Sequence, residues 1–297
     1  MIRKLADAAT KRLYFAAKFV YQLLAPRGEQ RVLFILGCQR SGTTLMQQIF
    51  DADLDARVFG EFSEITLTGK RPNLRLRPLA EVREIIERSP ARLVVAKPIA
   101  ETQNALKLLG HFPSAKAVFI YRHYAPVAAS NLKEFGRLNG INNLRPIVKR
   151  EAGNWRSENV PEDVRDIVLR HFREDMNPYD AAALFWYVRN RFYFDLGLDR
   201  HPAVLPLRYE DLLRDPAGRL ERIYSFVGAP GSRRGVRLVR GERGRRGIEL
   251  SADIEHLCAG LLARLDHANG RAWTRPLILE PRYGGARGLP QSHQARG

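Results

Sequence analysis

One loop of the sequence has the residue types and spacing of a phosphate-binding site. The loop Gly37-Cys38-Gln39-Arg40-Ser41-Gly42-Thr43-Thr44 follows the apolar residues 31–36 and leads into a helical pattern over residues 43–51. In this layout the backbone N–H groups of the loop and of the first helical turn point at one place. They bind a phosphate group, helped by the helix dipole. Gly42 lets the chain turn without placing a Cβ against the ligand.

The loop departs from that of nucleotide hydrolases at one position. Those enzymes carry a lysine after the second glycine, together with an aspartate that holds magnesium. This sequence has Thr43 at the lysine position, and no apolar segment ends in a convincing aspartate. A cation, Arg40, lies inside the loop instead. We therefore expect phosphate binding without hydrolysis of a magnesium-bound nucleoside triphosphate, and a P-loop kinase or NTPase is the first alternative.

The segments around the loop indicate an α/β fold. Apolar segments that are each followed by a helical pattern predict a P-loop-like, doubly wound, mainly parallel sheet flanked by helices. They cover residues 31–36, 93–96, 117–121 and 203–207. Ligands bind at the carboxyl ends of such strands, where the loop, Lys97 and Arg122 all fall. Pro206 in the last segment is typical of an edge strand or a strand end.

Arg122 is followed by a second residue suited to binding an anion. Ser130 comes eight residues later, on the helix predicted after the third strand. A guanidinium at a strand end and a hydroxyl on the next helix can converge on one phosphate group. The sequence therefore predicts a second phosphate site beside the first.

The loop and the Arg–Ser pair together resemble the donor site of the sulfotransferases that use 3′-phosphoadenylyl sulfate (PAPS). Residues 39–44 resemble the family's 5′-phosphosulfate loop, and the spacing of Arg122 and Ser130 resembles its 3′-phosphate site. The form of residues 40–46 is most similar to protein-tyrosine and bacterial carbohydrate sulfotransferases. The resemblance runs from about residue 31 to residue 266. It implies contacts with PAPS from Arg40, Ser41, Gly42, Thr43, Thr44, Arg122 and Ser130.

Two further segments resemble the same family. Residues 207–212, followed by Asp215-Pro216, are similar to its RYEDL…DP segment, in which the tyrosine approaches the adenine. Tyr209 is therefore a candidate donor contact, and it would equally suit packing at a strand end. The Arg/Gly-rich residues 233–247 fall where the family places a basic loop over the 3′ phosphate. The usual Arg-Lys-Gly is absent, so the choice among Arg243, Arg245 and Arg246 stays open.

The resemblance also implies catalytic residues. Sulfuryl transfer resembles phosphoryl transfer, an in-line displacement that needs cations at the leaving phosphate oxygen. Arg40 is the first candidate, and Lys97 resembles a lysine that protein-tyrosine sulfotransferases use for this purpose. The acceptor hydroxyl needs a base, and Glu61 resembles the catalytic glutamate of a Gly-Glu pair in related enzymes. The competing bases are Glu64, one helical turn further on, His111 and His123, of which His123 equally suits a local hydrogen bond.

The composition of the chain limits the kinds of partner and metal that we expect it to bind. A net charge of +17 implies an anionic partner (a nucleotide, a nucleic acid, an acidic glycan or a membrane surface) or an arginine-rich solvated surface. A nucleic-acid-binding protein is the second alternative. We expect no nucleic acid, because residues 233–247 contain no aromatic residue for bases to stack on. No cysteine/histidine spacing suggests zinc, so no metal is expected.

The chain divides into a helix, a domain and a tail. Residues 1–28 predict an amphipathic helix, residues 29–275 a sulfotransferase domain, and residues 276–297 a disordered tail. The helix either packs on the flank of the domain or rests on an anionic membrane surface. With only two cysteines we expect a reducing compartment, the cytoplasm, extending to the inner membrane surface if the helix binds lipid. The expected acceptor is a hydroxyl of a glycan or lipid, ahead of tyrosine.

Overall fold

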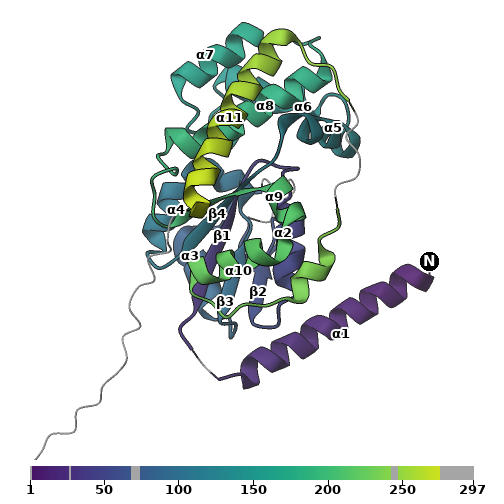
Figure 1. Ribbon diagram of the computed structural model, residues 1–297, viewed down its shortest axis with the longest axis vertical. Coiled ribbons are helices and arrows are strands. Elements are labelled where there is room, and N and C mark those ends of the chain that lie inside the picture. Colours follow the sequence, from purple (N-terminus) through teal and green to yellow (C-terminus); the bar gives the residue numbers. More distant parts are fainter. Residues whose placement is uncertain (1, 27, 68–73, 242–246, 275–297) are drawn as a thin grey trace, which may run out of the picture.

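The protein is built around one parallel sheet with helices on both faces (Figure 1). The computed structural model describes residues 2–26, 28–67, 74–241 and 247–274. The sheet has five strands in the order β2-β3-β1-β4-β5, and every neighbouring pair is parallel. The predicted α/β class and parallel sheet are confirmed. The strands are β1 (Arg31–Gly37), β2 (Ala56–Phe59), β3 (Leu93–Ala96), β4 (Lys116–Tyr121) and β5 (Val204–Arg208).

The two edge strands differ in how well the sequence predicts them. β5 pairs with β4 alone, and Pro206 lies opposite Phe119 in that pairing, so the edge position that its proline suggested is confirmed. β2 was not predicted. It is only four residues long, and Arg57 and Val58 in its middle are half-buried, so it lacks the continuous apolar run of a buried strand.

Residues of the central strand β1 are buried on both faces of the sheet. Val32, Phe34 and Leu36 pack on one face, and Leu33 and Ile35 pack on the other. Two-sided burial is why a parallel strand reads as an unbroken apolar run rather than as an alternating one. The second face is covered by α2 (Thr43–Asp51), α9 (Tyr209–Arg214) and α10 (Pro216–Val227).

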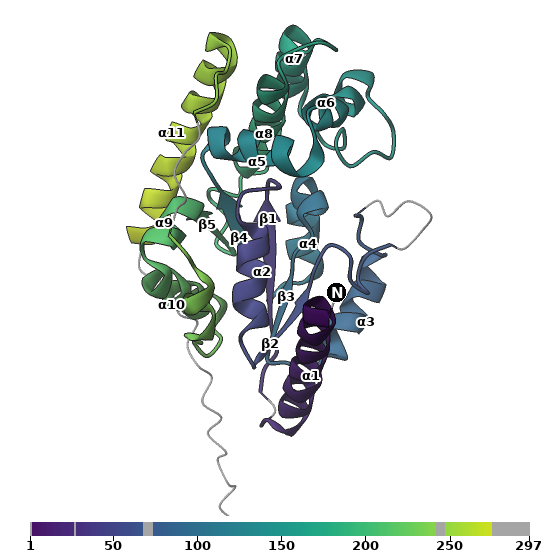
Figure 2. The ribbon, with the colours of Figure 1, turned by 90° about the vertical axis from the view of Figure 1, so that its right-hand side faces the viewer.

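The first face carries a thicker helical layer, part of which stands above the sheet in Figure 2. Its central member is α8, on which Trp186, Arg189, Phe192 and Tyr193 are almost fully buried. The layer comprises α3 (Leu79–Glu87), α4 (Ala105–His111), α5 (Tyr124–Phe135), α6 (Asn139–Lys149), α7 (Glu162–His171), α8 (Pro178–Asp195) and α11 (Ala252–Thr274).

Three smaller features complete the fold. Short 3-10 helices, η1 (Ile99–Asn104) and η2 (Arg234–Leu238), follow β3 and α10. The helix α1 (Ile2–Leu24) lies on the flank of the domain and projects away from it (Figure 1). None of the helices in the described ranges is both long enough and apolar enough to cross a membrane. The candidates Arg243, Arg245 and Arg246 and the predicted tail 276–297 lie outside the described residues.

Candidate active site

The predicted phosphate loop leads from the end of β1 into α2. Gly37 has φ +134°, and a Cβ there would lie 2.2 Å from the carbonyl oxygen of Ile120 on β4, so a side chain is sterically excluded. Gly42 precedes α2 in the left-handed region, at φ +99°, and no side chain caps the first turn of the helix. The N–H groups of that turn are therefore left for an anion. Ser41 is fully buried, and its Oγ has no hydrogen-bond partner within the described residues.

Arg40 connects the loop to helix α5. Its backbone has φ +66°, a conformation that costs a non-glycine residue about 1–2 kcal/mol. Its Nε donates a hydrogen bond of 3.0 Å to Ser130 Oγ. Its guanidinium lies 3.4 Å from a carboxylate oxygen of Glu134 and 5.8 Å from the ring centroid of Phe135. The strained backbone thus aims Arg40 at the second predicted phosphate site.

Tyr209 joins the remaining predicted donor contacts. Its ring packs against Gly42 so closely that a Cβ on that glycine would lie 2.3 Å from a ring carbon. The guanidinium of Arg122 lies over the same ring, 4.4 Å from its centroid. Arg122 Nε is buried and without a partner in the described chain, while its carbonyl accepts a hydrogen bond from Trp186. Arg122, Tyr209 and Gly42 therefore form one continuous surface.

Lys97 and Glu61 meet at the ends of two neighbouring strands. Lys97 directly follows β3, and its N–H donates to the carbonyl of Phe59, the last residue of β2. This strand-end pairing brings Lys97 Nζ to 2.9 Å from a carboxylate oxygen of Glu61. Both side chains are largely buried. The two predicted catalytic residues, 36 positions apart in the sequence, are thus in direct contact in the structure.

The competing bases occupy other positions. Glu64 was expected one helical turn after Glu61, but residues 60–66 form turns, and Glu64 pairs with Arg57 on the exposed side. His111 ends α4, which leads into the opposite, amino-terminal edge of β4. His123 caps α5, because its Nδ1 accepts a hydrogen bond from the N–H of Ala125. His123 therefore makes the local hydrogen bond that was considered as the alternative to a catalytic role.

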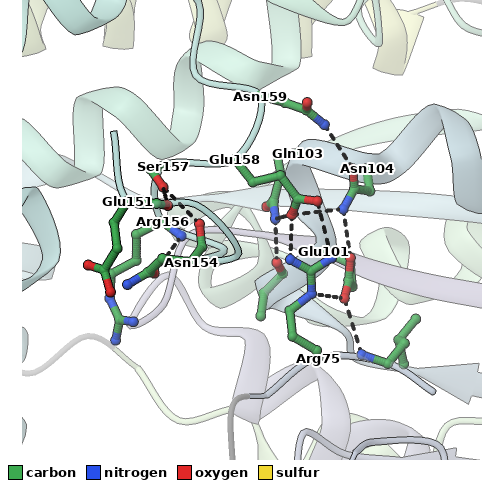
Figure 3. A network of polar contacts seen from close by, with 12 residues as sticks. Arg75, Glu101, Gln103, Asn104, Glu151, Asn154, Arg156, Ser157, Glu158 and Asn159 are labelled. Atoms are coloured by element: carbon green, nitrogen blue, oxygen red, sulfur yellow. Dashed lines mark hydrogen bonds and ion pairs between the residues drawn. The ribbon is translucent and has the colours of Figure 1, made fainter. Parts of the chain in front are cut away.

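A polar network supports the segments that carry Lys97 and Glu61 (Figure 3). Arg75 lies on the segment after Glu61; its Nε donates to Glu101 on η1 at 2.7 Å, and its Nη1 contacts Glu158. Glu101 also accepts from the N–H of Leu76 and from Asn104. Burial acts to raise the pKa of Glu158. The hydrogen bonds from Arg75 and the neighbouring amides, with the charge of Arg75, have the larger combined effect, so the pKa is lowered from its ordinary value. No motif marks these residues in the sequence.

The network continues into the core below the loop. The guanidinium of Arg189 on α8 is fully buried and donates to Gln103 and to the carbonyl of Ile99, at 2.9 and 2.8 Å. Burial lowers the pKa of Arg189 to about 10. Thr102 Oγ accepts the N–H of Gly37 at 3.1 Å, so η1 also anchors the start of the phosphate loop. One short helix therefore connects the loop, the lysine and the segment after Glu61.

Cys38 is a structural residue of the loop. Its side chain is buried, and this burial raises the pKa of the thiol to about 12, with the charge of Arg189 acting in the other direction. A thiol with so high a pKa carries no appreciable thiolate near neutral pH. Cys38 therefore fills its place in the loop as a small, weakly polar side chain.

Comparison with known proteins decides the family. The model of the sulfotransferase domain family matches residues 30–240. The chain belongs to the PAPS-dependent sulfotransferase family. Curated proteins gave no match.

One solved structure shows the same fold, and two others are reported as matches. The sulfotransferase domain of the Synechococcus PCC 7002 olefin synthase is 19% identical, with a TM-score of 0.51 over 84% of this chain and 98% of that domain. A sulfotransferase domain from the curacin biosynthetic pathway is 15% identical, with a TM-score of 0.49 over 81% and 99% of the two chains. A sulfotransferase from Alicyclobacillus acidocaldarius is 16% identical, with a TM-score of 0.44 over 84% and 100%.

The candidate site of this sulfotransferase offers two places that could each bind a phosphate group of the donor. The uncapped first turn of α2 and the unpartnered Ser41 Oγ lie at the loop. Arg122, whose Nε has no hydrogen-bond partner in the described chain, contacts the ring of Tyr209, which also packs against Gly42 of the loop. Buried polar atoms without partners are costly, and an anion that accepts their hydrogen bonds removes that cost. No group of three or more metal-ligating side chains occurs in the described part of the chain.

Proposed function

We propose that this sulfotransferase transfers a sulfuryl group from PAPS to a hydroxyl of a glycan or lipid. The ion pair between Lys97 and Glu61, at 2.9 Å, carries the proposal. It places a cation and a carboxylate together at the carboxyl ends of β2 and β3, next to the phosphate loop on β1. PAPS, when bound, supplies the sulfuryl group and a phosphate leaving group.

Each residue has one task in this proposal. Glu61 accepts the proton of the acceptor hydroxyl while the acceptor oxygen gains the sulfuryl group. Lys97 and Arg40 stabilise the negative charge that develops on the leaving oxygen. The first turn of α2 and Ser41 would hold the phosphate next to the sulfuryl group, with Gly42, Thr43 and Thr44. Arg122 and Ser130 would hold the second phosphate, and Tyr209 would lie against the adenine side.

Exposed apolar side chains beside the reacting groups support an acceptor with an apolar part. Phe62 directly follows Glu61 and is 77% exposed. Phe135 is 52% exposed, and its ring lies against the guanidinium of Arg40. Leu138, three residues further on, is also exposed. A lipid, or a glycan linked to one, would bury these side chains, whereas a free glycan would leave them in water.

The donor is tested by thermal unfolding with adenosine 3′,5′-bisphosphate and, in parallel, with ATP and magnesium. We expect the bisphosphate to stabilise the protein, by about 2.7 kcal/mol at a concentration 100 times its Kd. Stabilisation by ATP and magnesium alone would restore the kinase or NTPase alternative. Binding of neither ligand, with tight salt-sensitive binding of DNA or RNA, would restore the nucleic-acid alternative.

The acceptor is tested with labelled PAPS and a panel of free glycans, glycolipids, lipids and tyrosine peptides. We expect transfer to the lipid-bearing acceptors, and a KM for them raised about tenfold by Phe62→Ser, which removes most of one apolar contact. Leu106→Ser on α4 is the matched control, since Leu106 is exposed but lies away from the site. Transfer to tyrosine peptides alone would overturn the acceptor class while leaving the donor intact.

The proposed location is the cytoplasm. Both cysteines, Cys38 and Cys258, are free and buried, as expected of a protein made in a reducing compartment. Fractionation of the producing cell, with detection of the chain in the cytosolic and membrane fractions, tests this directly. Recovery from an extracellular or periplasmic fraction would overturn it.

A further inference from the structure

Helix α1 presents its polar side to the protein and its apolar side to solvent. Tyr14, Lys18 and Gln22 recur every four residues and so share one face of the helix. This face is bonded to the domain: Lys18 Nζ donates to the carbonyl of Asp51 at 2.8 Å, and Tyr14 OH donates to the same carbonyl at 3.1 Å. Gln22 donates to the carbonyl of Leu54 at 2.8 Å. A surface helix normally buries its apolar stripe, so the polarity of α1 is reversed.

The outward side of α1 is largely apolar over residues 13–24. Leu13 and Leu24 are 71% and 80% exposed, and the side chains between them on the same side are exposed as well. These are Phe19, Val20 and Leu23. In Figure 1 α1 stands out from the body of the protein, and in Figure 2, seen from that side, no described element lies in front of it. A row of large apolar side chains left in water marks an interaction surface.

Basic residues are abundant in the sequence of α1 and also line a groove beside it. The sequence of α1 contains Arg3, Lys4, Lys11, Arg12 and Lys18 against the single acidic residue Asp7. A groove of about 1520 Å³ separates α1 from η2, and three exposed arginines line its far side. They are Arg233, Arg234 and Arg237, and none of them forms an ion pair within the described residues. Three aspartates, Asp51, Asp53 and Asp55, also line the groove, and Asp53 among them is buried and accepts a hydrogen bond from Tyr224.

We propose that α1 and the arginines of η2 form a docking surface for an anionic lipid bilayer. The exposed leucines of α1 enter the boundary between headgroups and acyl chains, and the arginines contact the lipid phosphates. A second copy of the chain fits this surface less well, because a symmetric pair would bring two positively charged helices together. The docking site is separate from the catalytic residues, and it does not depend on which acceptor the enzyme uses.

The test is sedimentation of the full chain with vesicles. We expect binding to phosphatidylcholine vesicles that contain about one third phosphatidylglycerol, and little binding to phosphatidylcholine alone. The double variant Leu13→Gln/Leu24→Gln should weaken binding more than about tenfold and leave transfer to a soluble acceptor unchanged. Its matched control is Leu106→Gln/Leu169→Gln, which removes two exposed leucines on α4 and α7 and should bind as the unmodified chain does.

A second variant tests the basic part of the surface. Replacing Arg233, Arg234 and Arg237 by glutamine should weaken binding to anionic vesicles and flatten its dependence on salt. The proposal is overturned if the unmodified chain does not bind anionic vesicles, or if Leu13→Gln/Leu24→Gln binds as well as its control. It is also overturned if the chain is a dimer in solution that this double variant converts to monomers, because the apolar side would then be an interface between two copies.

Discussion

Lys18 and Lys97 are buried to the same extent, each only 4% exposed, but they have different partners. Lys97 contacts the carboxylate of Glu61 at 2.9 Å. Lys18 donates instead to the backbone carbonyl of Asp51, and burial lowers its pKa to about 8, against a smaller opposing effect of Asp51 and Asp53. Lys97 is therefore held by a carboxylate at the edge of the sheet where the reaction is proposed. Lys18 is held by a backbone carbonyl where α1 contacts the domain.

The comparison shows two uses of a buried cation. A lysine paired with a carboxylate is held in place, where a transition state with a growing negative charge can use it. A lysine bonded only to carbonyl groups carries a net cost of burial, so its contribution to docking depends on its protonation. The sequence shows two lysines; what each does follows from its partner.

The largest effects are expected from breaking the Lys97–Glu61 pair. Glu61→Gln should lower kcat by about 10²–10⁴-fold, because the acceptor loses its base. Lys97→Met should lower kcat by about 10²–10³-fold through loss of charge stabilisation. Steady-state transfer assays give both values, and binding of adenosine 3′,5′-bisphosphate shows whether the donor site survives.

Glu64→Gln is the matched control for the base, since Glu64 pairs with Arg57 on the exposed side. It should transfer at the rate of the unmodified enzyme. If Glu64→Gln were inactive and Glu61→Gln active, Glu64 would be the base and the contact of Glu61 with Lys97 would be structural.

An intermediate effect on stability is expected at Arg75. Arg75→Ala leaves the buried Glu101 and the half-buried Glu158 without their cation, which should cost about 3 kcal/mol in free energy of unfolding. Unfolding in urea measures this cost. Arg88→Ala, which breaks an exposed pair with Glu84 on α3, should cost less than about 0.5 kcal/mol. Equal costs for the two variants would mean that the network in Figure 3 does not stabilise the fold.

The smallest effect is expected at Lys18, and it depends on pH. Docked α1 lowers the pKa of Lys18 from 10.5 to about 8, so docking carries the cost of a buried charge below pH 8. The cost disappears as pH rises from 8 toward 10.5, and docking becomes more stable over that window. Lys18→Met should therefore dock α1 more stably at pH 7, by about 1 kcal/mol, because Tyr14 still bonds the carbonyl of Asp51.

Amide hydrogen exchange of residues 12–24 measures this docking. The protection of Lys18→Met and of the unmodified chain should converge as pH approaches 10.5. A difference that stays constant across this range would show that Lys18 does not titrate in the docked helix. Groups elsewhere titrate equally in both proteins, so they cancel from the comparison.

Much of the donor side was predictable because its signals are local. Strand, loop and helix follow one another within residues 31–51, so their order along the chain is also their order in space. The eight-residue spacing of Arg122 and Ser130 likewise spans one strand end and one helix. β2 and the turn that holds Glu64 were not recovered, because a four-residue strand with two half-exposed residues and a turn without a helical pattern leave no periodicity to detect.

The sequence by itself determined the fold class, the phosphate loop, the family and the amphipathic character of α1. Only the tertiary structure decided that Lys97 contacts Glu61, that Arg75 connects to Glu158, and that α1 docks through its polar side. These contacts join residues 36, 83 and 33 positions apart. Helical periodicity shows that a helix has two unlike faces, but which face is buried depends on the carbonyl groups and side chains that the rest of the fold places beside it.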